Sequence, residues 1–147
     1  MNSLELSSSV RRAVGALGRR LRAQRPENGL SLTKLSVLGQ LYRRGSMSAA
    51  ELAALERVQP QSLTRVLAEL VEAGLVSRRA DVKDGRRLLL DITGDGRAML
   101  TRDMQQRDAW LARAMADELS VTERELLRLA TQLLERLADV EATYENE

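Results

Sequence analysis

Gln, Ser, Thr and Arg side chains gather around Pro60, and five cations gather between residues 78 and 87. The first group comprises Gln59, Gln61, Ser62, Thr64 and Arg65. Short amide and hydroxyl groups with one guanidinium suit hydrogen bonding to base edges and phosphates. The second group comprises Arg78, Arg79, Lys83, Arg86 and Arg87, and a basic segment of this kind suits a phosphate ridge or a minor groove. By residue type alone, the first group is equally compatible with an ordinary polar surface.

The sequence has few of the residues that catalysis, metal binding or cofactor binding would need. The chain has no cysteine and no histidine, so it lacks a disulfide framework, thiolate metal ligands and the commonest zinc ligand and general base. Asp81 and Asp84 lie among the five cations, where we expect ion pairs that order a turn rather than paired acids for catalysis. The sequence Gly94-Asp95-Gly96 lacks the third glycine of a dinucleotide-binding loop. We therefore expect no enzyme, no metal site and no cofactor.

Charge is segregated along the chain although the net charge is only +2. Residues 1–26 hold six arginines against one glutamate, whereas residues 117–147 hold nine acids against three arginines. Lys34 and Lys83 are the only lysines, and arginine offers a planar donor fork for phosphate and guanine. A gene rich in G and C also favours arginine at solvent-exposed positions, and this would give the same composition. No apolar run could span a bilayer and no leader pattern is present, so we expect a cytoplasmic protein without membrane contact.

Two short helices are predicted around Pro60, and the second of them carries the polar group. Ser48 and Glu51 have the spacing of a capping box, which opens a helix that ends near Leu55 or Glu56. Pro60 suits the first turn of a second helix, which Gly74 ends. The apolar positions of this second helix share one stripe and leave the polar group outside it: Leu63, Val66, Leu67 and Leu70.

A hairpin is predicted to follow. Residues Leu75–Arg78 and Leu88–Ile92 have the composition of strands, and Asp84-Gly85 between them predicts the turn. The basic segment then projects beside the second helix. We expect the Asp84 carboxylate to pair with the Arg86 guanidinium across the turn.

Longer helices flank this region. The first, over residues 7–25, ends at Pro26 and the Asn28-Gly29 turn, and its apolar stripe contains Val10, Val14, Leu17 and Leu21. Ser31 caps the next helix, whose apolar positions are Leu35, Leu38, Leu41 and Tyr42. Thr93 opens a fifth helix, and the Ser120–Glu123 capping box opens a sixth with a broad leucine face. That face predicts contact with a second subunit, and an intramolecular bundle with the first helix is the alternative.

The order and spacing of these segments resemble the MarR family of transcription regulators. The likeness extends over nearly the whole chain in length and helix order, and the hairpin core Asp84-Gly85-Arg86 is its most specific part. The matching segments are Ser48–Ala53, Val58–Arg65, Leu70–Val76, Asp81–Arg87 and Ile92–Gly96.

The resemblance implies a mainly α fold with a small β-hairpin wing, a winged helix-turn-helix with N- and C-terminal dimerisation helices. The implied divisions are an N-terminal dimerisation helix (1–30), a DNA-binding winged module (31–92) and C-terminal dimerisation helices (93–147). The helix after Pro60 would enter the major groove, and its base and phosphate readers would be Gln59, Gln61, Ser62, Thr64 and Arg65. In the wing, Arg86 would reach the minor groove with Asp84 orienting it, while Lys83 and Arg87 would contact the DNA backbone.

Some features depart from the family. Without cysteine the chain cannot use thiol oxidation, and without histidine it matches zinc-sensing relatives poorly. Val82 stands where the family often has proline. Relatives commonly bind small aromatic or amphipathic effectors between the dimer helices and the winged module. The only aromatic residues here are Tyr42, Trp110 and Tyr144, so a pocket is left unassigned and core roles are expected for Tyr42 and Trp110.

The sequence thus predicts a homodimer that binds double-stranded DNA at a near-palindromic operator, with half-sites about one duplex turn apart. Repression is favoured over activation, and release by a small-molecule effector is left open. The alternative is a non-catalytic helical adaptor that uses the winged module for protein contact.

Overall fold

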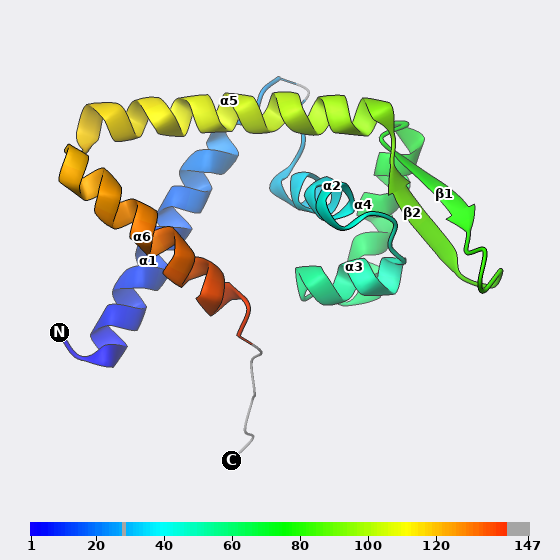
Figure 1. Cartoon of the computed structure of the whole chain (residues 1–147), viewed down its shortest axis with the longest axis horizontal. Helices are drawn as coiled ribbons and strands as arrows, with labels where there is room; N and C mark the ends of the chain where they lie inside the picture. Colours follow the sequence, from blue (N-terminus) through cyan, green and yellow to red (C-terminus); the bar gives the residue numbers. More distant parts are fainter. Residues whose placement is uncertain (28, 141–147) are drawn as a thin grey trace, which may run out of the picture. The chain divides into compact units, whose positions relative to one another are not determined.

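The computed structural model describes residues 1–27 and 29–140 and is mainly helical, with one antiparallel two-stranded sheet (Figure 1). The predicted class, helices with a small β-hairpin, is confirmed. The chain forms two compact units, residues 1–108 and residues 109–147. The second unit is described up to residue 140. The elements are α1 (Ser3–Ala23), α2 (Leu32–Arg44), α3 (Ala49–Glu56), α4 (Pro60–Glu72), β1 (Val76–Ala80), β2 (Leu88–Ile92), α5 (Gly94–Glu118) and α6 (Val121–Ala138).

Side chains three residues apart set the helix starts. Ser48 accepts the N–H of Glu51, and the Glu51 carboxylate accepts the N–H of Ser48, which confirms the predicted capping box of α3. The same reciprocal pair opens α6. Helix α1 begins at Ser3, earlier than predicted, because Asn2 and Glu5 form a further capping box. Of the turn predicted after α1, Asn28 lies outside the described residues.

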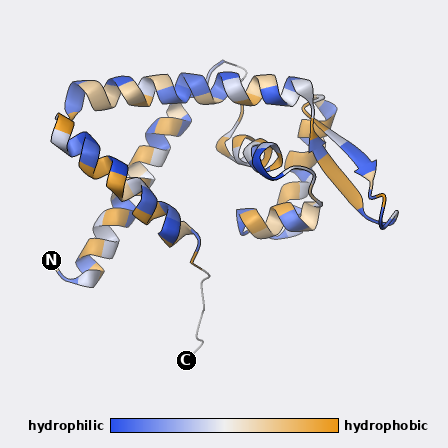
Figure 2. Ribbon diagram, viewed as in Figure 1, coloured by the Kyte–Doolittle hydropathy of each residue, from blue (hydrophilic) through white to orange (hydrophobic). Residues whose placement is uncertain are grey.

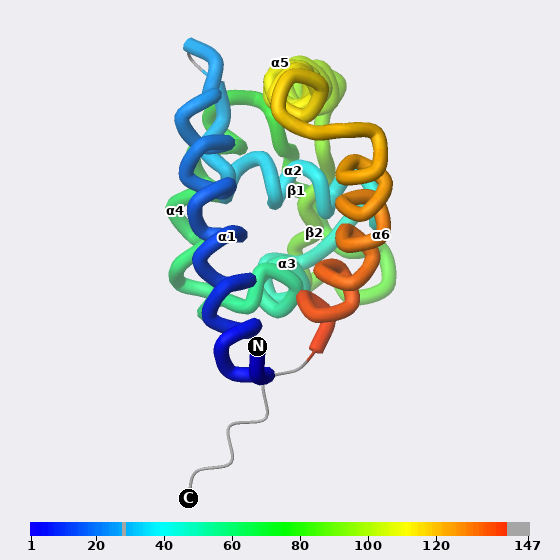
Figure 3. Tube along the Cα trace, turned by 90° about the vertical axis from the view of Figure 1, so that its left-hand side faces the viewer, coloured from blue at the N-terminus to red at the C-terminus, as the bar shows by residue number. Residues whose placement is uncertain are grey.

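The core of the first unit lies where α2, α3 and α4 meet the hairpin and the start of α5. These elements lie together in both views (Figures 1 and 3). The predicted buried stripe of α4 is confirmed, because Leu63, Leu67 and Leu70 are at most 4% exposed and Val66 packs against them. Tyr42 was wrongly predicted as a core position: it is 61% exposed, since it follows Leu41 and turns toward the edge of the stripe.

The two strands of the hairpin differ in composition and burial. Val76 pairs with Ile92 and Ala80 with Leu88, so β1 begins one residue later and ends two residues later than predicted, while β2 has the predicted bounds. Figure 2 shows β2 as largely hydrophobic and β1 as more hydrophilic. Leu90 of β2 is buried and exchanges backbone hydrogen bonds with Met47, which anchors the hairpin to the segment before α3.

Gly96, in the first turn of α5, allows two chain segments to approach closely. A Cβ at this position would lie 2.2 Å from the Leu75 carbonyl oxygen, so only glycine permits this approach of α5 to the residue before β1. The predicted N-cap, Thr93, accepts the N–H of Gly96 and donates its hydroxyl to the Gly74 carbonyl oxygen. Gly96 therefore serves packing, whereas a Cβ at Gly94 would meet no atom within 4 Å.

A buried ion pair on α5 holds the segment between α1 and α2. Asp103 is fully buried and Arg107 is 5% exposed, and their Nε–Oδ1 distance is 2.7 Å. Asp103 also accepts the N–H of Leu30 at 2.7 Å, while Arg107 donates to the carbonyl oxygens of Leu30 at 2.8 Å and Leu21 at 3.4 Å. All these polar groups are paired, as burial requires.

Two helices keep apolar faces on the surface. No residue of α1 is buried, and Val14 and Leu17 of its predicted stripe are exposed. No residue of α6 is buried either, and Leu126, Leu133 and Leu137 are more than half exposed. Within residues 1–27 and 29–140, none of the helices combines the length and apolarity needed to cross a bilayer.

Candidate nucleic-acid interface

The N-terminal turns of α4 present the polar group to solvent. Gln59, Gln61, Ser62, Thr64 and Arg65 are all exposed, as expected for residues outside the buried stripe. Gln59 is the N-cap but makes no side-chain capping hydrogen bond, so its amide is not used to start the helix. Pro60 occupies the first turn as predicted.

Two of these side chains already have partners on the protein. The Thr64 hydroxyl donates to the Pro60 carbonyl oxygen at 3.3 Å. The Arg65 Nε donates to Glu69 at 2.9 Å, and Glu69 is also paired with Lys34 of α2 at 2.8 Å. These two cations, Lys34 first, hold the pKa of the Glu69 carboxyl below its ordinary value. The Arg65 side chain nevertheless stays 90% exposed, so its terminal nitrogens remain accessible.

The wing loop is ordered differently from the prediction. The Asp84 carboxylate accepts the backbone N–H of Arg86 at 3.1 Å, and Asp81 accepts that of Lys83 at 3.0 Å. The predicted Asp84–Arg86 ion pair is absent among the described residues, because a short aspartate reaches the amide two residues ahead more readily. Lys83 and Arg86 are both exposed at the tip.

Arg87 lies at the base of the loop and joins the wing to α3. Its guanidinium pairs with the Glu51 carboxylate of the α3 capping box. The pKa of Glu51 is therefore below its ordinary value, chiefly because of the Ser48 N–H and then because of Arg87. Arg79, farther down the hairpin, pairs with Asp91 at 2.8 Å. Two of the five predicted wing cations thus serve the protein's own structure.

Helix α4 and the basic strand lie beside each other. Thr64 of α4 and Arg78 of β1 line one hollow of about 200 Å³ together with Ala49, the first residue of α3. The structure therefore brings the α4 polar turns, the α3 start and the hairpin together within the first unit. In this arrangement Arg65 is paired with Glu69, and Arg87 is paired with Glu51.

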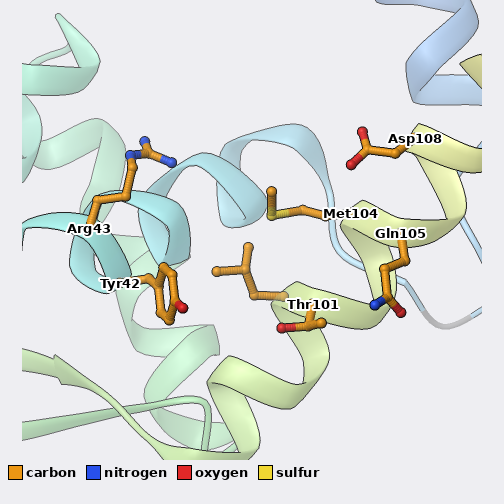
Figure 4. Close-up of a pocket in the computed structure, with 7 residues that line it drawn as sticks. Tyr42, Arg43, Thr101, Met104, Gln105 and Asp108 are labelled. Carbon is orange, nitrogen blue, oxygen red and sulfur yellow. The ribbon is translucent and has the colours of Figure 1, made fainter. Parts of the chain in front are cut away.

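A second hollow, of about 290 Å³, lies between α2 and α5 (Figure 4). Tyr42 and Arg43 line it from α2, and Leu100, Met104 and Asp108 are among its lining residues on α5. Its surface is partly apolar with a polar edge, which suits a small aromatic molecule. Tyr42 therefore lines a pocket, whereas a place in the core was predicted. Trp110 is half-buried, and Tyr144 lies outside the described residues.

Sequence reasoning missed three features of this region. The Glu51–Arg87 pair joins residues 36 apart, and no local pattern indicates it. The Asp103–Arg107 pair has the i, i+4 spacing of an ordinary surface pair, so only its burial is unexpected. The third feature is the left-handed backbone of Arg57, for which the sequence offers no glycine or asparagine as a signal.

Comparison with known proteins gives consistent matches. The model of the MarR family matches residues 30–88. An uncharacterised HTH-type transcriptional regulator of Mycobacterium bovis is 38% identical over 134 residues, which cover 91% of this chain and 93% of that protein. An HTH-type transcriptional repressor of the same organism is 36% identical over 71% of this chain and 76% of its own length. The crystal structure of a Pseudomonas aeruginosa transcriptional regulator matches with a TM-score of 0.77 at 36% identity, covering 95% and 96% of the two chains.

Proposed function

Because this chain belongs to the MarR family and is a DNA-binding transcriptional regulator rather than an enzyme, we propose that it represses transcription as a homodimer bound to a near-palindromic operator. In this proposal residues 1–30 and 93–147 supply the dimer contacts and residues 31–92 the DNA contacts. The protein would act in the cytoplasm, on duplex DNA. Repression is favoured because a relative that matches 71% of the chain is named a repressor.

The observation that carries the proposal is the exposed polar start of α4 beside a basic hairpin. Gln59, Gln61 and Ser62 are exposed on a helix whose opposite face is buried, so the helix can lie in a groove without unfolding the core. Thr64 and Arg65 would read base edges, with Arg65 exchanging its Glu69 partner for DNA. In the wing, Arg86 would reach the minor groove and Lys83 the backbone, while Arg87 would position the wing through Glu51 and touch phosphate from there.

Salt titration tests DNA binding directly. If the dimer neutralises about eight phosphates, log affinity for duplex DNA falls with log salt concentration at a slope of roughly −7, because bound counterions are released. Affinity then drops about 10⁴-fold between about 50 and 200 mM salt. Fluorescence anisotropy measures the salt slope and the fall in affinity, with the DNA upstream of the protein's own gene and with a shuffled duplex. A flat salt response would support the adaptor reading instead.

Arg86→Ala is the informative variant for this titration. Loss of two arginines per dimer reduces the slope to roughly −5 and weakens every duplex, and it also blunts any preference for A·T-rich flanks. Val82→Ala is a matched control, because Val82 is a 93% exposed neutral residue of the same loop. An unchanged ranking of flanks in Arg86→Ala would place Arg86 outside the minor groove.

We further propose that the hollow beside Tyr42 binds a small aromatic effector that weakens operator binding. Benzoate and its 2-hydroxy derivative are suitable probes, and a coupling of about 5- to 150-fold on operator affinity is expected at saturation. Met104→Trp should fill the hollow and remove the ligand's effect while leaving ligand-free DNA affinity unchanged. Equal ligand effects in the wild type and Met104→Trp would exclude this hollow as the site.

A further inference from the structure

Arg57, the residue that ends α3, has a left-handed backbone, with φ 54° and ψ 43°. It is the only non-glycine residue with positive φ in the described part of the chain. Its N–H still closes the helix end, by donating to the Ala54 carbonyl oxygen at 3.2 Å. A side chain with a Cβ is strained in this conformation, and glycine or asparagine adopts it more readily.

The chain itself provides the comparison. Glycine occupies the other two positive-φ positions, Gly45 after α2 with φ +84° and ψ −159°, and Gly74 after α4 with φ +74°. At both of these helix ends the local conformation therefore selected the residue that accommodates it without strain. The end of α3 also has a positive φ, yet an arginine is present there. Strain of this kind at a surface turn points to a function of the side chain.

The position of Arg57 indicates what that function is. Arg57 is exposed and lies in the turn of the helix-turn-helix, with only Val58 and Gln59 between it and the start of α4 at Pro60. The Val58 N–H donates to the Ala53 carbonyl oxygen, so the turn is held tightly against α3. A guanidinium at this point lies close in sequence to the polar residues that open α4. Guanidinium groups bind phosphate through paired, charge-assisted hydrogen bonds.

We propose that Arg57 contacts a DNA phosphate at the turn between α3 and α4, and that its strained backbone is kept because the side chain is needed there. This inference rests on the proposed DNA-binding function and adds a residue to it. The contact positions α4 on the duplex and carries no base specificity, because phosphates are the same at every base pair.

Arg57→Gly gives effects of opposite sign on folding and binding. Removing the strain raises the midpoint of thermal unfolding, whereas removing the guanidinium weakens binding to the upstream duplex and to a shuffled duplex by the same factor, about tenfold. Because a dimer loses two cations, the salt slope becomes less negative by about 1.8. Circular dichroism melting and anisotropy titrations on the full-length dimer measure these changes.

Two further variants separate charge from backbone conformation. Arg57→Lys keeps the charge and the strain, so it should retain the wild-type salt slope and melting midpoint. Arg57→Asn tolerates the left-handed backbone without the charge, so it should behave like Arg57→Gly in binding. A lower melting midpoint in Arg57→Gly, or an unchanged affinity and slope, would overturn the inference. A flat salt response of the wild type would instead refute the proposed function itself.

Discussion

Arg107→Met is expected to lower the free energy of unfolding by about 3–5 kcal/mol, because it leaves the Asp103 carboxylate buried without its cation. The Leu30 carbonyl oxygen also loses its guanidinium donor, while that of Leu21 keeps the Gln24 N–H. The contact that should weaken most is the one between α5 and the segment that joins α1 to α2. Urea denaturation followed by circular dichroism measures it, with both proteins at the same concentration since dimerisation shifts apparent stability.

Arg128→Ala is the matched control for this change. Arg128 forms an ion pair of the same 2.7 Å length with Glu125, but both side chains are more than half exposed on α6. Solvent screens such a pair, so its loss should leave the unfolding curve unchanged. If Arg107→Met and Arg128→Ala unfold at the same urea concentration as the wild type, the buried pair does not fasten this region.

The second large effect concerns the proposed dimer. Leu133→Glu combined with Leu137→Glu should convert the protein to monomers, because both leucines are exposed on one face of α6 and charges there cannot be buried in an interface. A monomer reaches only one half-site, so operator affinity should fall by about 10² or more as the second contact is no longer tethered. Sedimentation equilibrium and anisotropy titration on the same samples measure the two quantities.

Thr131→Glu is the control, since Thr131 lies on the opposite side of α6 by helical spacing and its hydroxyl only bonds to the Arg128 carbonyl oxygen. It should remain dimeric and bind DNA normally. A wild-type protein that sediments as a monomer, or a double variant that remains dimeric, would contradict the assignment of α6 to the interface.

Local signals gave most of the architecture. The Ser48–Glu51 and Ser120–Glu123 boxes and the glycine at Gly74 lie within a few residues of the backbone groups that they satisfy, so their effect is independent of the remaining fold. The apolar spacing of α4 likewise identified its buried face. The prediction of α1 was less accurate at its start, where Asn2 and Glu5 extend the helix beyond its apolar stripe.

The candidate interface was predictable in outline but not in its pairings. Exposure of the α4 polar group follows from the stripe, whereas the roles of Thr64 and Arg65 on DNA remain predictions. The partner of Asp84 was predicted wrongly, because the choice between a guanidinium and a nearby amide depends on the loop conformation. The wall position of Tyr42 was missed since residues at the edge of a stripe can face either way.

The sequence by itself determined where most helices begin and end, which face of α4 is buried and that a basic hairpin follows it, because these depend on hydrogen bonds and periodicities a few residues long. Tertiary structure alone decided which charges are buried or paired at long range. Leu30 and Asp103 are 73 residues apart, and Glu51 and Arg87 are 36 apart. Such pairs form only after packing has brought distant segments together, and burial then makes an i, i+4 pair such as Asp103–Arg107 indispensable instead of incidental.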